Sequence, residues 1–215
     1  MSDTFGRVWS PARLVGVVAR PQTYKNLAYL LVTLPLAIVY ASVLTVGFAF
    51  GLILSIVLVG LAVLLGIVIA ARGLAGIERW LANALLSVEL RTPDDVSAGD
   101  GPIESARRYL EAPSTWRGLG FLSVKFYVGI VGIILVVFLA ETVQLLFAPL
   151  QYPARIEFGE VNDEPVAWTI QSLPESLLAA VVGLVGAIVV LHLINGFAYV
   201  VCRIAEALLG GDSDA

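Results

Sequence analysis

Long runs of apolar residues dominate the chain and are separated by polar segments. No charged side chain occurs in the 46 residues between Lys25 and Arg72, and two further apolar stretches follow at about 126–154 and 176–202. A helix rises about 1.5 Å per residue, so the first run would reach roughly twice the ~30 Å hydrocarbon thickness of a bilayer. The pattern therefore predicts four transmembrane helices, with the first two forming a hairpin that turns near Gly47–Gly51.

Weaker patterns predict short helices beside the spans. Ser10–Pro11 is typical of a helix start, because serine caps a helix and proline fits its first position. Residues 1–23 are therefore predicted to contain an interfacial helix. Residues 74–90 should continue the second span as an amphipathic helix, and residues 103–111 should form a short polar helix. Ser114 is the expected cap of the third span.

The segment between the third and fourth spans has a different pattern. Apolar and polar residues alternate over 155–161 and 166–170, which predicts a small β-hairpin. Ser172 and Glu175 have the spacing of a capping box, which should start the fourth span. We interpret this outer loop as a covered connection between spans, with a ligand-facing cap as the alternative.

The two predicted hairpins resemble one another in sequence. Tyr24-Lys-Asn-Leu-Ala-Tyr-Leu-Leu-Val aligns with Trp116-Arg-Gly-Leu-Gly-Phe-Leu-Ser-Val, and the segments that begin at Gly73 and Gly196 also align. In both copies an aromatic and a basic residue precede an apolar helix, as interfacial anchors do. We interpret the copies as a parallel repeat about an axis along the membrane normal. The alternative is that any two apolar hairpins align to some extent.

These elements predict an all-α membrane protein. Its four transmembrane helices form two parallel-repeat hairpins, accompanied by interfacial amphipathic helices and a small outer β-hairpin. The expected parts are an N-terminal cytoplasmic interfacial helix (1–23), a first hairpin with its exit helix (24–91), a cytoplasmic loop and short helix (92–115), a second hairpin (116–209) that includes the outer loop 149–175, and an acidic tail (210–215).

The distribution of charge predicts the orientation in the membrane. Basic residues gather before the first span, between the second and third spans, and after the fourth, whereas Arg155 is the only basic residue of 149–175. Cytoplasmic loops carry an excess of lysine and arginine. Both termini and the segment 72–118 are therefore predicted to be cytoplasmic, in a multi-pass protein of the cell membrane.

Composition narrows the classes of function. Hydrophobic residues make up 59% of the chain, and the mean hydropathy is +0.91. The chain has a single cysteine, Cys202, and a single histidine, His192. This excludes an intramolecular disulfide and any metal site that needs several cysteine or several histidine ligands. No catalytic motif is present, so we expect a protein without enzymatic activity, metal or cofactor. The pI near 5.0 and the acidic tail predict a halophilic setting.

Polar groups inside the apolar stretches are the candidate functional residues. Ionisable side chains are costly in a membrane and are functional candidates by default. Glu141 lies in the outer part of the third span, and His192 and Asn195 lie in the inner half of the fourth. We expect either interhelical hydrogen bonds or a sensing role for them. Lys125 is expected to extend toward the inner interface, as long basic side chains do.

Three segments combine an apolar pattern with aromatic and basic anchors. They are Tyr24-x-x-Leu-x-Tyr-Leu-Leu-x-x-Leu-Pro35-Leu, Arg72-Gly-Leu-Ala-Gly-Ile-Glu78-Arg79-Trp80 and Trp116-Arg117-x-Leu-x-Phe-Leu. Together they resemble the putative sensor domain family, a four-helix membrane module found ahead of some histidine kinases and as free-standing chains in halophilic archaea. The resemblance covers about residues 20–209 and implies signal sensing, without implying a particular ligand.

The expected function is that of a sensory or regulatory membrane module. Because the chain ends at Ala215 without a phospho-acceptor helix, we expect the signal to pass to a separate protein, such as a kinase, regulator or transporter subunit. Arg107 and Arg108, away from the span ends, are the candidate partner surface. Membrane lipids are the other expected partners, self-association is an option, and nucleic acid is not expected. The alternative function is a small transporter or lipid-binding protein with a cavity between the repeats.

Overall fold

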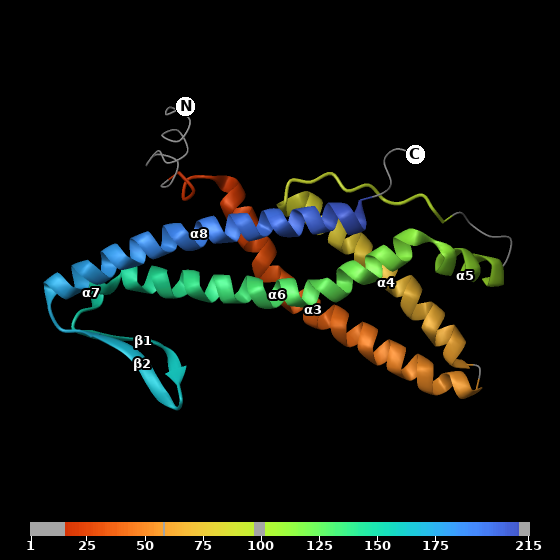
Figure 1. Cartoon of the computed structure of the whole chain (residues 1–215), viewed down its shortest axis with the longest axis horizontal. Helices are drawn as coiled ribbons and strands as arrows, with labels where there is room; N and C mark the ends of the chain where they lie inside the picture. The colour runs from red at the N-terminus through yellow and green to blue at the C-terminus, as the bar shows by residue number, and fades with distance from the viewer. Residues whose placement is uncertain (1–15, 58, 97–101, 211–215) are drawn as a thin grey trace, which may run out of the picture. The chain divides into compact units, whose positions relative to one another are not determined.

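The computed structural model describes residues 16–57, 59–96 and 102–210 (Figure 1). Four of its helices are long and apolar enough to cross a membrane, which confirms the four predicted spans and identifies a multi-pass membrane protein. The elements are α3 (Pro21–Leu54), η1 (Ser55–Val57), α4 (Val59–Leu85), α5 (Pro102–Glu111), α6 (Pro113–Leu146), α7 (Ala148–Gln151), β1 (Ala154–Val161), β2 (Glu164–Ile170) and α8 (Leu173–Leu209).

The chain divides into two compact units. The first unit comprises Met1–Tyr24 and Ile134–Gly196, and the second comprises Lys25–Ile133 and Phe197–Ala215. The second unit contains almost all of α3, with α4, α5, the first part of α6 and the end of α8. The first unit contains the remainder of α6 and α8 and everything between them.

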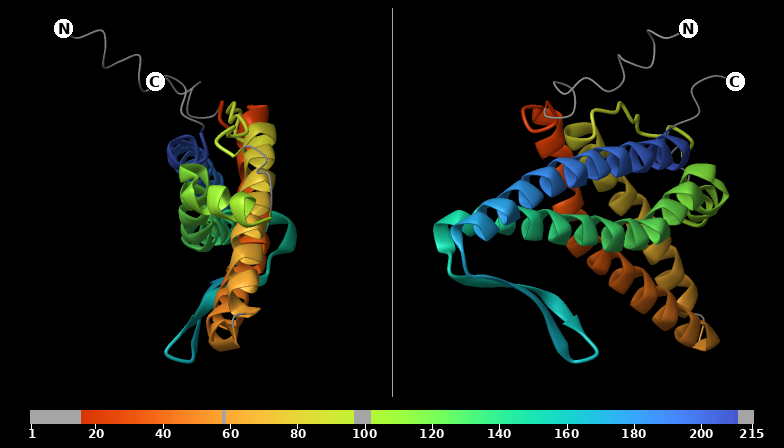
Figure 2. Two further views of the ribbon diagram at one scale, coloured as in Figure 1. Left: turned by 90° about the vertical axis from the view of Figure 1, so that its right-hand side faces the viewer. Right: turned by 60° about the vertical axis from the view of Figure 1, so that its left-hand side comes forward.

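In the second unit, α3 and α4 form a helical hairpin (Figure 2). The predicted turn near Gly47–Gly51 is wrong, because α3 continues to Leu54 and the reversal begins at Ser55. The two helices extend beyond the flanking charges, from Pro21 to Leu85, so the reversal between them lies further along the chain than the glycines.

The two glycines serve close packing inside the hairpin instead of a turn. A Cβ atom at Gly51 would lie 2.5 Å from Leu64 Cδ2, and one at Gly47 would overlap the side chain of Ile67. Small residues let helices approach closely, which is a main source of helix association in membranes. The third helix of this unit, α6, approaches α3 in the same way, since a Cβ at Gly129 would lie 3.0 Å from the Cα of Leu34.

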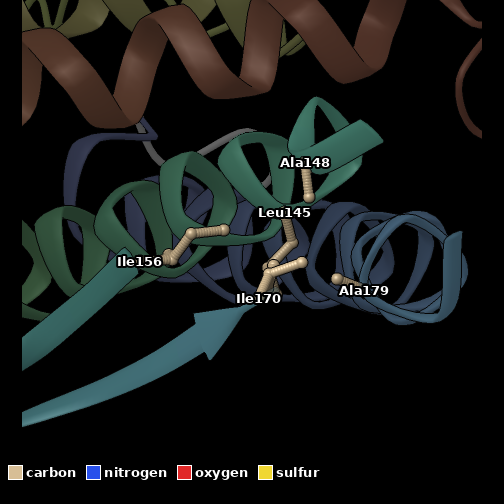
Figure 3. Packing of buried hydrophobic residues seen from close by; sticks show 5 residues of the cluster. All are labelled: Leu145, Ala148, Ile156, Ile170 and Ala179. Atoms are coloured by element: carbon tan, nitrogen blue, oxygen red, sulfur yellow. The ribbon is translucent and has the colours of Figure 1, made fainter. Parts of the chain in front are cut away.

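In the first unit, α6 and α8 pack together and support the β-hairpin. β1 and β2 pair antiparallel, from Ala154 opposite Ile170 to Val161 opposite Glu164, with an irregularity between Glu157 and Glu160. This confirms the predicted hairpin. Its base is fixed by an apolar cluster drawn from five elements, as Figure 3 shows, which consists of Leu145, Ala148, Ile156, Ile170 and Ala179.

The start of α8 confirms the predicted capping box. Glu175 accepts hydrogen bonds from the backbone N–H groups of Gln171 and Ser172, at 2.8 and 3.2 Å. The Ser172 hydroxyl in turn accepts from the N–H of Glu175 at 3.4 Å. These bonds satisfy N–H groups that have no partner within a helix.

The short helices between the spans agree in part with the sequence. The polar helix predicted at 103–111 is present as α5, and the amphipathic segment from residue 74 continues α4 but ends at Leu85. Most of the predicted interfacial helix lies outside the described residues, and the residues from Gly16 to Ala19 form a turn. The internal repeat and the proposed division into parts stay predictions.

Candidate functional site

A buried ion pair lies among three helices of the second unit. The Lys125 ammonium, on α6, donates hydrogen bonds to Glu78 Oε2 of α4 at 2.6 Å and to the Tyr29 hydroxyl of α3 at 2.8 Å. The side chains of Lys125 and Glu78 are both 0% exposed. One cation thus contacts α4 and α3 from α6 and fixes the three helices relative to one another.

Aromatic rings complete the surroundings of the ammonium. Lys125 Nζ lies 4.2 Å from the ring centroid of Tyr29 and 5.9 Å from that of Phe121. A cation over an aromatic face is attracted by the ring quadrupole, and by more when water is excluded. Two further buried oxygens, Glu78 Oε1 and Tyr40 Oη, have no hydrogen-bond partner among the described residues.

The expectation that Lys125 extends to the membrane interface is therefore wrong. The position of Lys125 along α6 would allow its side chain to reach the interface. It is held instead by Glu78, a charged partner buried between the packed helices. The sequence did contain a signal for Glu78. It lies at helical spacing from Ala71, Ala75 and Ala82, all buried on one face of α4. A carboxylate on a face of small residues needs a partner inside the protein.

A second polar network joins α4 to the start of α6. The Arg72 guanidinium donates to Asp95 Oδ1 at 2.8 Å and to the Ser114 hydroxyl at 2.5 Å. Asp95 Oδ2 accepts from the backbone N–H of Ser114 at 3.0 Å. Ser114 is therefore not the cap predicted for the third span. The cap is Asp95, which lies 19 residues earlier in the chain and could not be recognised by local spacing.

These contacts change the acidity of Asp95. Burial by itself would raise the pKa of this carboxyl, but the hydrogen bonds from Arg72 and Ser114 outweigh it and lower the pKa to about 2. Because the folded-state pKa lies below the ordinary value, the stabilisation is present above about pH 4 and is lost as the pH falls toward 2.

We expect Asp95→Asn to lower the melting temperature at pH 7 by about 2–4 °C, a modest shift because the group is partly screened by solvent. The difference from the unaltered protein should shrink as the pH falls from 4 toward 2, where Asp95 itself takes up a proton. Thermal melts in an uncharged detergent at several pH values would measure this. A difference that stays constant down to pH 2 would show that the Asp95 carboxylate does not stabilise the fold.

A cavity of about 840 Å³ adjoins this network in the second unit. Its wall includes the end of α4, the segment that follows it, the start of α6 and the end of α8. Arg79 Nε donates to the carbonyl oxygen of Leu209 at 3.0 Å and so joins α4 to the last turn of α8. The lining residues are Arg79, Glu89, Leu90, Arg91, Thr92, Pro93, Asp94, Asp95, Ser114, Arg117, Glu206, Leu208, Leu209 and Gly210.

The candidate residues in the spans all lie in the first unit. Asn195 of α8 donates to the Thr23 hydroxyl at 2.9 Å, and Thr23 donates to the Val17 carbonyl at 3.0 Å. Asn195 thus ties α8 to the first turn of α3. His192 is exposed, and its Nδ1 lies 2.8 Å from the Ile188 carbonyl oxygen. Glu141 is half-buried, with one carboxylate oxygen lacking a partner among the described residues.

Glu141 and His192 lie at different levels of the α6–α8 pair. The residue after Glu141, Thr142, packs on α8 at Gly183 and Gly186. His192 lies six residues beyond Gly186, which corresponds to about 9 Å of helix. Their sensing role stays a prediction.

The predicted partner surface lies on α5. Arg107 pairs with Glu111 at 2.7 Å, and Arg108 pairs with Glu104 at 3.3 Å. The Arg107 side chain is 71% exposed, and the hydrogen bond and charge of Glu111 raise its pKa, so it keeps its charge at all physiological pH values. α5 is held against α6 by the Trp116 indole, which donates to the Leu110 carbonyl at 2.8 Å.

These features define a four-span membrane module in which charged networks join α4 to α3 and α6. The chain belongs to the family described as "Putative sensor", whose model matches residues 11–209, and this confirms the resemblance seen in the sequence. No curated protein and no solved structure matches the chain.

Proposed function

We propose that this protein is a sensory or regulatory membrane module without enzymatic activity, which passes a signal to a partner protein through its segment 72–118. Membership of the sensor family supports a sensing role, and the four apolar helices support a location in a membrane. The partner would be a kinase, a regulator or a transporter subunit.

The observation that carries the proposal is that α4 bears two separate charged contacts, one at Glu78 and one at Arg72. Glu78 is fixed to α3 and α6 through Lys125, and Arg72 lies six residues earlier on the same helix, about 9 Å away along its axis. Arg72 holds Asp95 and also lies over the ring of Tyr109 in α5, at 5.9 Å from its centroid. A displacement of α4 relative to α6 would therefore move the segment that carries α5.

Charge reversal on α5 tests the partner contact. We expect the double variant Arg107→Glu, Arg108→Glu to insert and fold normally, because exposed ion pairs within one helix contribute little stability. It should nevertheless lose the proteins that co-purify with the affinity-tagged chain after cross-linking in native membranes. Quantitative mass spectrometry of the captured proteins measures the loss.

The matched control is Arg155→Glu, a charge reversal on the β-hairpin, which should retain every captured protein. Arg155 is also exposed and also pairs with a glutamate of its own element, Glu157 at 3.2 Å. If the α5 variant and the Arg155→Glu control both retain every captured protein, then the signalling surface does not include α5.

We also propose that the termini and the segment 72–118 face the cytoplasm, on the basis of the charge distribution. In a chain with Cys202→Ser, an impermeant thiol reagent applied to intact cells should modify a cysteine at Asp163→Cys. It should modify Asp94→Cys only after the membrane is opened. Both positions are exposed, so accessibility within the fold does not limit the reaction. Modification of the cysteine at position 94 in intact cells would show that this segment lies outside, opposite to the proposed orientation.

A further inference from the structure

The cavity of the second unit contains the guanidinium of Arg79, which forms no ion pair with any residue that the structure describes. Arg79 is 6% exposed, and its only hydrogen bond within the described part of the chain is from Nε to the Leu209 carbonyl. Its terminal N–H groups therefore have no acceptor among the described residues, although Arg79 lines the cavity. A buried cation without a counter-charge is costly, and this cost is removed when an anion binds.

The described carboxylates that line the cavity form no direct ion pair with Arg79, and only Asp95 attracts it from a distance. Asp95 is held by Arg72 and Ser114, and Glu206 pairs with Arg203 at 2.8 Å. Glu89 and Asp94 are exposed, and neither forms an ion pair with Arg79. Two further arginines, Arg91 and Arg117, line the same cavity from the segment after α4 and from α6.

We propose that this cavity binds a phosphate group, with the buried Arg79 as its main contact and Arg91 and Arg117 as additional contacts. A guanidinium can donate two parallel hydrogen bonds to two oxygens of one phosphate group, and arginine is therefore the preferred residue for binding phosphate. The volume is within the usual range for small-ligand sites, about 300–1,000 Å³. Such a phosphate can come from the headgroup of an anionic phospholipid or from a soluble phosphate ester.

The position of the site is accessible both to a phospholipid headgroup and to a soluble phosphate ester. Arg79 and Arg117 lie near the charged ends of α4 and α6, where lipid headgroups are found if these helices span the membrane. The segment after α4 is polar and exposed at Arg91 and Asp94, so a soluble ester also has access. This site differs from the proposed partner surface on α5 and goes beyond the proposed function.

Calorimetric titration of the full chain in an uncharged detergent tests the inference. The probes are glycerol phosphate and dihexanoyl-phosphatidylglycerol. Binding of glycerol phosphate supports a site for soluble esters, whereas binding of the phosphatidylglycerol alone supports a headgroup site. Absence of binding by either probe would overturn the proposal.

Three variants connect the binding to the cavity. Arg79→Gln and Arg91→Gln should each weaken the affinity for the bound probe by about tenfold, the loss of one charge-assisted hydrogen bond. Arg155→Gln removes the same charge in the other unit and should leave the affinity unchanged. Arg91 is exposed, so its variant remains informative if Arg79→Gln does not fold. Equal affinities for all these proteins would also overturn the proposal.

Discussion

Lys125→Met is expected to lower the free energy of unfolding by about 3–5 kcal/mol, because it leaves the Glu78 carboxylate buried without its cation. The loss also includes the hydrogen bond to Tyr29 and the contact with its ring. Reversible unfolding in mixed micelles, followed by circular dichroism, would measure it. Glu78→Gln should destabilise the protein similarly, since it leaves the ammonium without a counter-charge.

A double variant separates the ion pair from the packing around it. With Glu78→Gln and Lys125→Met together, no charge remains buried, so the protein should be more stable than either single variant. Lys25 is the only other lysine and is exposed. Lys25→Met should therefore change the stability by less than about 0.5 kcal/mol. If the free energy of unfolding lost by the double variant equals the sum of the losses of the two single variants, then Glu78 and Lys125 are not coupled.

Gly183→Ala should lower the stability by about 1–3 kcal/mol, because α6 leaves no room for a methyl group at this position. A Cβ there would lie 2.6 Å from the Thr142 carbonyl oxygen and 2.7 Å from the Leu146 nitrogen. Both are backbone atoms, so the two helices would have to separate. The same unfolding measurement in mixed micelles applies.

Two other glycines of α8 provide a graded comparison. At Gly186 the nearest atom to a Cβ is the Thr142 methyl group, 2.7 Å away, which a side-chain rotation can move. Gly186→Ala should therefore cost less than Gly183→Ala. At Gly196 no atom lies within 4 Å, so Gly196→Ala should be neutral or stabilising by up to about 1 kcal/mol. Equal effects at the three positions would contradict the close packing of α6 and α8.

The sequence by itself determined the features that depend on neighbouring residues. The length of an apolar run compared with the bilayer thickness requires two spans between Lys25 and Arg72 and one in each later stretch. The alternation over 155–161 and 166–170 determined the β-hairpin, and the spacing of Ser172 and Glu175 determined the helix cap. In each case the groups that interact are close in the chain.

Only the tertiary structure decided which distant polar groups meet. Glu78 and Lys125 are 47 residues apart, and Asp95 caps a helix whose first residue is Pro113. The helices are apolar over most of their length, so their sequence patterns do not show which face packs inward. They also do not show which positions of two helices lie side by side. That choice depends on how closely small residues allow the helices to approach. It placed Lys125 against Glu78, and it left Arg79 without an ion pair among the described residues.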